Sequence, residues 1–290
     1  MRKNFWGVAL ICLLAGALAH SGEPVDDRVI ASIKMEGFQN SQLMDTAFHL
    51  TEVHGPRLIG TPSLKAAAQW SRDRLAEWGL ENAHLESWDL AIPGWNLESY
   101  SAELLEPRYL RLAAVPMAWT PATDGVIEGV PILVKVENEG DFEEHRGRLR
   151  GSIVLNDAVK VLDAEMAAAA RRLSDDKLQE LFGAMVPGVP ADYWEELDKW
   201  YEEFEEFAKV IRFFKEEGVA ALILPSSRAN GVVRVSYSGL EKIDGNAPTF
   251  VVALESFNMV ARLVERGFEP KLRLESRVEI VEDVKGYNVI

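Results

Sequence analysis

The chain has 290 residues, of which 48% are hydrophobic and 27% are charged, and its formal net charge is −15 at pH 7. This length and apolar fraction suffice for one large globular domain or two ordinary ones. The excess of acidic residues argues against nucleic acid or an anionic membrane surface as a partner.

Residues 1–19 have the pattern of a secretory signal. Arg2 and Lys3 form a basic start, an apolar run covers residues 5–14, and Ala17-Leu18-Ala19 is typical of a cleavage site. The apolar run is shorter than the about 20 residues that span a bilayer, so export is favoured over a membrane anchor. We therefore expect a secreted or periplasmic protein, with no membrane span after the signal is removed.

The single cysteine, Cys12, lies within this signal. The mature chain is therefore expected to form no disulfide, although its compartment would permit one. Removal of the signal takes away two positive charges and no acidic residue, which changes the formal net charge from −15 to −17.

Residues 23–50 are predicted to contain two helices, one around Val29–Gly37 and one at Gln42–Thr51. His49 and His54 stand alone in this part of the chain. An isolated histidine near a helix end is more often a surface or capping residue than a metal ligand.

Residues 51–88 are predicted to form a turn, a helix, a second turn and a strand. Thr61 and Pro62 suit the N-cap and the first helical position, and Gly79 suits the position after the last turn. Residues 83–88 alternate like a strand. Small and apolar residues recur every three or four positions along one helix face: Leu64, Ala67, Ala68, Ser71, Leu75 and Trp78.

This stretch resembles the start of the peptidase domain in secreted co-catalytic zinc exopeptidases, the family of bacterial aminopeptidases and carboxypeptidase Q. The shared pattern is an Arg-x-x-Gly-Thr turn (Arg57, Gly60, Thr61), an Ala-rich helix, and Gly-Leu before a strand. The resemblance implies an α/β fold and an enzyme that hydrolyses the terminal peptide bonds of small peptides with two zinc ions.

Residues 124–157 are rich in β signals, with short strands expected at 125–129 and 132–136. Gly147–Leu155 is similar to a strand of the protease-associated (PA) domain, a β-sandwich that several exopeptidases carry as an insertion. The helix–strand step at Gly218 and Val219–Leu224 is similar to the same domain.

Two helices are predicted within this insertion, at residues 163–185 and 192–217, and the second carries an apolar stripe widened by Trp200 and Phe207. Its many glutamates are interpreted as a solvated face, because no histidine accompanies them. Further along the chain, strands are expected at 232–237, 249–254, 271–274 and 277–281, and a helix at 255–267.

Val284–Ile290 resembles the family strand that leads into the metal site. The chain stops inside this apparent strand, so we expect a truncated sequence whose catalytic portion follows Ile290. The sequence contains no His-Glu-x-x-His, paired-cysteine or Gly-x-Ser-x-Gly motif.

His84 and Glu86 are two positions apart on an expected strand, so they share one face as two metal ligands would. The family has an ordinary strand here, and its metal motif carries aspartate where this chain has Glu86. Ordinary strand residues are therefore the favoured interpretation. We assign no catalytic, cofactor-binding or metal-binding residue, and we carry over Arg57 and Gly60 only as structural residues.

These observations predict an α/β fold in four parts. They are a signal at 1–19, the N-terminal part of a peptidase domain at 20–118, an inserted PA domain at 119–274, and a return strand at 275–290. Two zinc ions and a peptide substrate are expected for the full enzyme, and no zinc on this chain alone. The alternative is a non-catalytic PA-type binding or interaction module, which fits the missing ligands equally well.

Overall fold

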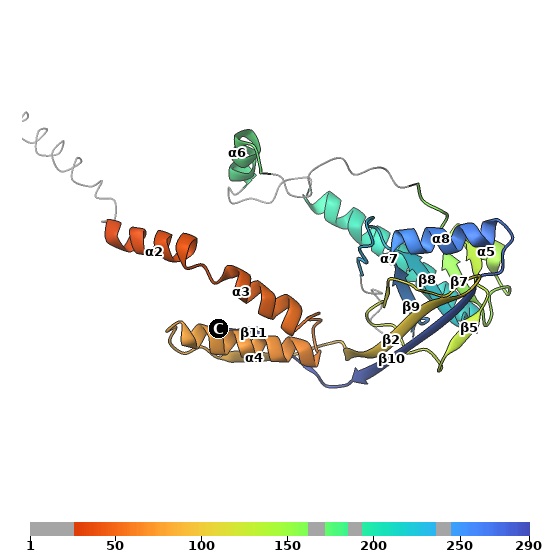
Figure 1. Cartoon of the computed structure of the whole chain (residues 1–290), viewed down its shortest axis with the longest axis horizontal. Coiled ribbons are helices and arrows are strands. Elements are labelled where there is room, and N and C mark those ends of the chain that lie inside the picture. Colours follow the sequence, from red (N-terminus) through yellow and green to blue (C-terminus); the bar gives the residue numbers. More distant parts are fainter. Residues whose placement is uncertain (1–25, 162–171, 185–192, 236–244) are drawn as a thin grey trace, which may run out of the picture. The chain divides into compact units, whose positions relative to one another are not determined.

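The computed structural model describes residues 26–161, 172–184, 193–235 and 245–290 (Figure 1). The expected signal at 1–19 lies outside these residues. The chain divides into two units, one ending at Arg57 and the other beginning at Leu58.

The first unit is helical in its described part. It contains α2 (Asp27–Gln39), α3 (Leu43–Phe48) and a π-helical turn, η1 (His49–Val53). The Asp26 carboxylate caps α2 by accepting a hydrogen bond from the Arg28 backbone N–H at 2.9 Å. Every residue of α2 is exposed to solvent. The two predicted helices are confirmed.

The second unit begins with α4 (Pro62–Glu77), whose ends are those that the sequence predicts. Thr61 Oγ1 accepts a hydrogen bond from the Leu64 backbone N–H at 3.2 Å, and Gly79 follows the helix with φ at +86°. Ala67 and Ala68, which belong to the predicted helix face, are buried. Trp78, the last residue of the predicted helix face, is the C-cap of α4, and its side chain is 51% exposed.

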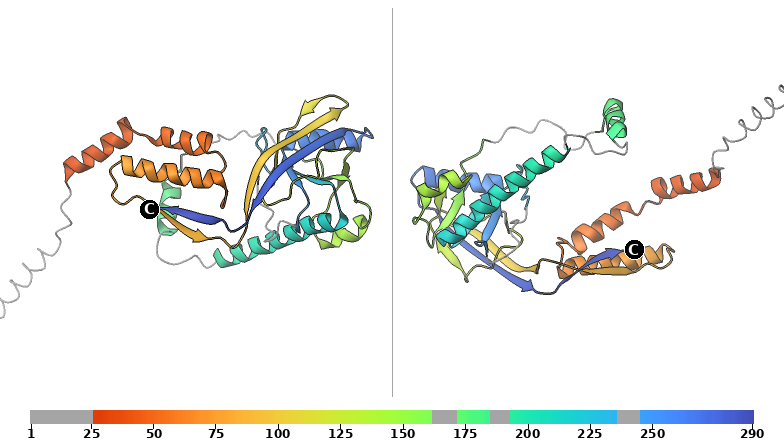
Figure 2. Two further views of the ribbon diagram at one scale, coloured as in Figure 1. Left: turned by 90° about the horizontal axis from the view of Figure 1, so that it is seen from below. Right: turned by 180° about the vertical axis from the view of Figure 1, so that it is seen from behind.

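α4 packs on a two-stranded antiparallel sheet (Figure 2). The sheet consists of β1 (Leu85–Asp89) and β11 (Lys285–Val289), so that Leu85 pairs with Val289 and Asp89 with Lys285. Both strands were predicted, and the structure adds that they are neighbours. We call α4, β1 and β11 the small sheet unit.

A second, antiparallel sheet is built on two long strands, β2 (Gly94–Glu106) and β10 (Lys271–Val281) (Figure 1). β3 (Leu110–Arg111) and β5 (Ile127–Gly129) pair with their outer edges, in the order β3-β2-β10-β5. β10 was predicted as two strands but is continuous, with a change of register between Arg277 and Val278.

The third sheet has the order β4-β9-β8-β7-β6 and is mostly parallel. Its strands are β4 (Ala114–Pro116), β6 (Ile132–Val134), β7 (Ile153–Asn156), β8 (Ala221–Pro225) and β9 (Thr249–Val252). Strands β6 to β9 pair in parallel, and β4 is the antiparallel edge. Continuous apolar runs such as residues 221–224 are typical of parallel strands, because both faces of such a sheet are covered.

Both faces of this mixed sheet are covered by other elements. On one face, Leu155 and Phe250 share a core with residues of the antiparallel sheet and with Phe257 of α8 (Leu254–Glu265). On the other face, Val154 and Leu222 pack with residues of α7 (Tyr193–Glu217). The α/β class is confirmed. The antiparallel sheet and the mixed sheet pack face to face through the core that they share. We call the two larger sheets with α7 and α8 the layered region.

Only the second half of α7 is packed as predicted. Ile211 and Phe214 are fully buried, but Trp200 and Tyr201 are 48% and 53% exposed. The prediction that Trp200 lies in a packed stripe is therefore wrong. Among the described helices, α7 included, none has the length and apolar character needed to cross a membrane.

Shorter elements complete the described structure: η2 (Glu139–Asp141), α5 (Phe142–His145) and α6 (Asp175–Ala184). α6 lies within the helix predicted at 163–185, and residues 163–171 and 185 of that helix are outside the described part. The strand predicted at 232–237 is wrong for its described residues 232–235, which have no regular secondary structure.

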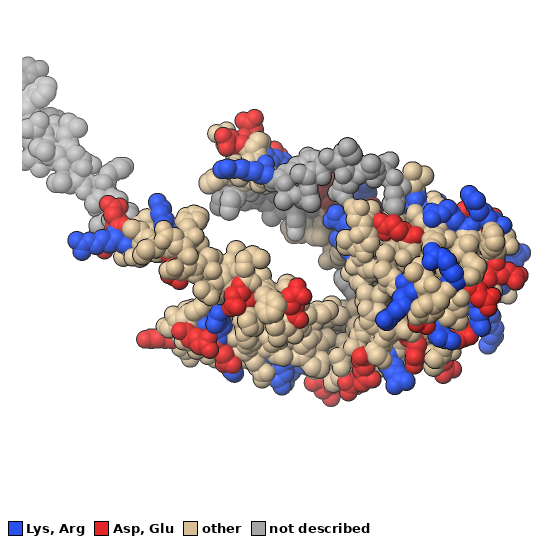
Figure 3. Space-filling model, in the orientation of Figure 1, with Lys and Arg blue, Asp and Glu red and all other residues tan. Residues whose placement is uncertain are grey.

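Acidic and basic side chains are interspersed on the face shown in Figure 3, rather than gathered by sign. Ion pairs on the antiparallel sheet are an example. Glu128 contacts Lys271 at 2.9 Å and Arg273 at 2.7 Å, and these two cations lower the pKa of its carboxyl group. Exposed pairs of this kind contribute little to stability individually.

Candidate functional site

Arg57 has the structural role that was expected for it. Its guanidinium group donates hydrogen bonds to the carbonyl oxygens of Leu50 and Gly55, the second at 3.2 Å. Arg57 therefore holds its own loop in place.

Gly60 also has a structural role. Its φ is +74°, and a Cβ atom at this position would lie 2.9 Å from the Val284 Cγ2 atom and 3.2 Å from the Gly94 Cα atom. The turn is therefore close-packed as well as left-handed, and both features require glycine.

His84 and Glu86 lie together on the exposed face of the small sheet unit. His84 exchanges backbone hydrogen bonds of 2.7 and 3.0 Å with Ile290, and Glu86 pairs with Asn288. The His84 Nδ1 atom lies 2.7 Å from the Asn82 carbonyl oxygen. The two side chains share a face, as their spacing predicts.

The opposite face of the small sheet unit is covered by α4. Tyr287 is half-buried there, and the Lys65 ammonium group lies 5.7 Å from the centre of its ring. The two faces of this sheet therefore differ, one packed on a helix and one open to solvent.

The described residues do not fit a two-zinc centre. Among them, no group of three or more His, Cys, Asp or Glu side chains is close enough to hold a metal ion. A zinc site takes three or four protein ligands, and His84 and Glu86 together are only two.

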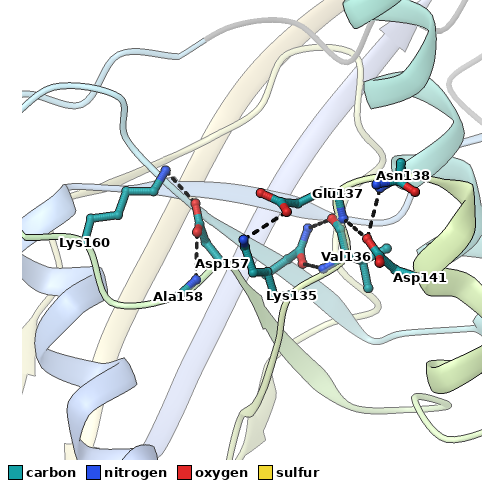
Figure 4. A network of polar contacts seen from close by, with 9 residues as sticks. Lys135, Val136, Glu137, Asn138, Asp141, Asp157, Ala158 and Lys160 are labelled. Atoms are coloured by element: carbon teal, nitrogen blue, oxygen red, sulfur yellow. Dashed lines mark hydrogen bonds and ion pairs between the residues drawn. The ribbon is translucent and has the colours of Figure 1, made fainter.

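A different set of polar residues lies where the parallel strands of the mixed sheet end. Asn156 is the last residue of β7 and is 9% exposed. Its Oδ1 atom accepts a hydrogen bond from the Val136 N–H at 2.8 Å, and its Nδ2 group donates to the Val136 carbonyl at 3.0 Å (Figure 4). Asn156 thus ties β7 to the segment that follows β6.

That segment is also held by Asp141 (Figure 4). The Asp141 carboxylate accepts hydrogen bonds from the backbone N–H groups of Glu137 at 2.8 Å and Asn138 at 3.2 Å. These two hydrogen bonds lower the pKa of the Asp141 carboxyl group, because they stabilise its ionised form.

The segment that follows β7 is held by an ion pair and by a buried amide. Asp157 Oδ2 lies 2.6 Å from Lys160 Nζ. Asn258 of α8, which is 3% exposed, accepts a hydrogen bond from the Lys160 N–H at 2.9 Å and donates to the Lys160 carbonyl at 2.8 Å. The backbone at Lys160 is therefore fixed against α8.

The loop that follows β8 is organised by Ser226, which is 1% exposed. Its hydroxyl donates to the Val232 carbonyl at 2.7 Å and accepts from the N–H groups of Arg228 and Arg234 at 3.2 and 3.0 Å. One buried side chain thus sets the path of residues 226–234.

Glu255, in the first turn of α8, holds the tip of the same loop. Its carboxylate accepts hydrogen bonds from the N–H groups of Asn230 at 2.6 Å and Gly231 at 3.2 Å. Hydrogen bonds from its own N–H and from Gly231 and Asn230 lower the pKa of Glu255.

We call the six residues Asn156, Asp157, Lys160, Ser226, Arg234 and Asn258 the strand-end rim. Two hollows open beside it, with volumes of about 520 and 360 Å³, and Asn156 and Phe207 line both of them. The carboxyl ends of parallel strands are the usual place for ligands in open α/β sheets.

Sequence reasoning did not single out this rim, although a signal was present. Asn156 and Ser226 each directly follow an apolar run that forms a buried strand. A polar residue in that position marks the carboxyl edge of a parallel sheet, where side chains from several loops meet.

No known family model matches the chain. Its fold is similar to that of a peptidase M28 precursor from Shewanella amazonensis, with a TM-score of 0.56 and 19% sequence identity. The likeness covers 90% of this chain and 52% of that protein. The chain therefore has the fold found in part of an M28 peptidase.

In sequence the chain is similar to carboxypeptidase Q. It is 24% identical to the protein of Mus musculus over 268 residues, which are 91% of this chain and 48% of the mouse protein. It is 30% identical to the protein of Bos taurus over 130 residues, which are 45% of this chain and 26% of the bovine protein. The chain spans about half the length of the mouse relative.

Proposed function

We propose that this chain is the N-terminal portion of an exported, zinc-dependent exopeptidase that hydrolyses the terminal peptide bonds of small peptides. The observation that carries the proposal is the similarity to carboxypeptidase Q, which extends over 91% of the chain. The likeness of its fold to an M28 peptidase precursor supports the same assignment.

In this proposal the chain supplies a scaffold, and both zinc ions are held by residues encoded beyond Ile290. Residues 20–118 and 275–290 belong to the peptidase domain, and residues 119–274 form an inserted PA domain. Two strands that precede this insert in the sequence pair with strands that lie in it or begin in it: β4 pairs with β9, and β2 pairs with β10. The basic, apolar and small residues of positions 1–19 support export.

The test is to sequence the gene past the codon for Ile290. The product of the complete reading frame is then expressed and compared with the 290-residue chain. The complete product is expected to contain a His-x-Asp motif and to hydrolyse dipeptides with free ends. A chelator should abolish this activity, and added zinc should restore it. The 290-residue chain should be inactive.

Blocked substrates distinguish the two kinds of exopeptidase. An aminopeptidase does not cleave a dipeptide whose N-terminus is acetylated. A carboxypeptidase does not cleave a dipeptide whose C-terminus is an amide. A stop codon directly after Ile290, or a complete product without chelator-sensitive hydrolysis, would overturn the enzyme assignment and favour a binding module.

A further inference from the structure

We propose that the smaller hollow of the strand-end rim binds the carboxylate of an apolar residue, such as the C-terminal residue of a peptide. This inference concerns a binding site in the layered region. It does not require metal or catalysis, so it goes beyond the proposed function.

The floor of this hollow is apolar and fixed. Met117, Leu224 and Val251 line it and are 1%, 9% and 4% exposed, respectively. Its volume of about 360 Å³ is at the small end of the range for ligand pockets, about 300–1,000 Å³. An aliphatic side chain fits such a floor, because burial on apolar atoms removes its surface from water.

The polar wall of the hollow carries an excess of positive charge. Lys160 and Arg234 line it together with a single acid, Asp157. The formal net charge of the whole chain is −15, so the sign at this position is opposite to that of the molecule. The expected ligand is therefore an anion with an apolar part.

The two cations are not equivalent. Lys160 is neutralised by Asp157 at 2.6 Å. Within the described residues, the Arg234 guanidinium group makes no ion pair. Because a guanidinium group binds a carboxylate through two parallel hydrogen bonds, we assign Arg234 as the principal carboxylate-binding residue.

The backbone that carries these side chains is held before any ligand arrives. The Ser226 hydroxyl accepts a hydrogen bond from the Arg234 N–H, and Asn258 bonds both the N–H and the carbonyl of Lys160. A preorganised wall loses less conformational entropy on binding than a mobile one. This arrangement distinguishes the hollow from a chance surface depression.

A peptide C-terminus and a short fatty acid present the same carboxylate, so the probes must separate them. N-acetyl-L-leucine represents the C-terminal residue, and N-acetyl-L-leucinamide is the same molecule without the charge. Hexanoate represents an apolar carboxylate without a peptide group. Binding to the whole 290-residue chain is measured for each probe by NMR line-shape or shift titration.

N-acetyl-L-leucine is expected to bind at least about 10-fold more tightly than its amide, since a hydrogen bond to a charged group is lost with the amide. Equal affinity for the acid and the amide would overturn the proposal. Tighter binding of hexanoate than of N-acetyl-L-leucine would also overturn it, because the peptide terminus would then not be the preferred source.

Variants locate the site. Arg234→Gln should weaken binding of N-acetyl-L-leucine by about 10- to 100-fold. Arg228→Gln is the matched control, since Arg228 is an exposed arginine of the same loop that does not line the hollow. Asp157→Asn should strengthen binding, because it releases Lys160 from its ion pair. Unchanged affinity in Arg234→Gln, or an equal loss in Arg228→Gln, would contradict the assignment.

Discussion

The layered region and the small sheet unit bury their strands to very different degrees. In the layered region, Val154, Leu222 and Phe250 are completely buried, since packed elements cover both faces of the mixed sheet. In the small sheet unit, β1 contains no buried residue along its fully described length, Leu85–Asp89. The layered region therefore has a hydrophobic core on each face of its mixed sheet. The small sheet unit has only the α4 helix, which covers one face of its two strands.

This difference indicates what stabilises each region. Burial of large apolar side chains dominates the layered region. In the small sheet unit, individual contacts on the exposed face contribute a larger share of the stability than they do in the layered region. The Trp88 ring lies across Gly286, where a side chain would collide with it, and Gly286 is buried in consequence.

The largest effect is expected from Phe257→Ala in the layered region. Phe257 is 0% exposed and lies in the core shared by both large sheets and α8. The loss of a buried phenyl ring and the cavity left behind should lower the free energy of unfolding by about 3–5 kcal/mol. Urea unfolding followed by circular dichroism measures this change.

Phe268→Ala is the control for this prediction, because Phe268 is 56% exposed. It should change the free energy of unfolding by no more than about 0.5 kcal/mol. A similar cost for both variants would show that the shared core is not what stabilises the layered region.

Asn156→Ala tests the polar edge of the same region. The substitution leaves the Val136 N–H and carbonyl groups without the partner that they have now. The expected loss is about 1–3 kcal/mol in urea unfolding, because an unsatisfied buried polar group is costly. Asn96→Ala removes a half-buried amide on β2 whose hydrogen bond to Glu279 is exposed to solvent, and it should cost far less; if it costs as much, burial of the hydrogen bond is not the cause.

Gly286→Ala tests the small sheet unit. The new methyl group collides with the Trp88 ring and should destabilise the pairing of β1 and β11 by about 1–3 kcal/mol. The cost should be smaller in a Trp88→Ala background, and hydrogen exchange of the Glu86 and Asn288 amides, a hydrogen-bonded pair of the two strands, reports on it. Equal costs in both backgrounds would mean that the ring does not occupy this position.

The smallest effect is expected from the titration of Glu255. Its pKa is lower in the folded state than in the unfolded state, so its stabilisation of the loop is present at neutral pH. That stabilisation is lost as the pH falls through the lowered pKa. The amide shifts of Asn230 and Gly231 should titrate together at acidic pH, and Glu255→Gln should abolish the titration. Independent midpoints for the two amides would contradict a shared carboxylate partner.

Local features of the fold were predictable from the sequence. The cap at Thr61, the glycine after α4 and the buried run of β8 are set by residues within a few positions of one another. The shared face of His84 and Glu86 follows in the same way from the alternation of a strand.

Features that depend on distant residues were not predictable. β1 and β11 pair although almost the whole sequence of the second unit lies between them. Neither strand has a sequence feature that identifies the other as its partner. Asn258 holds Lys160 from 98 positions away, so the strand-end rim becomes visible only when the sheet is assembled. The stripe on α7 is apolar throughout, but only its second half packs against the mixed sheet. Which half is buried therefore depends on the assembled layered region.

The central claim, that this chain is the scaffold of a zinc exopeptidase and holds no zinc centre itself, is tested most directly by metal analysis. The purified 290-residue chain is dialysed against zinc, and the bound metal is measured beside a His84→Ala/Glu86→Gln variant. We predict less than stoichiometric zinc on both proteins, with no difference between them. One or more tightly bound zinc ions per chain, lost in the double variant, would contradict the account and place a metal site on the small sheet unit.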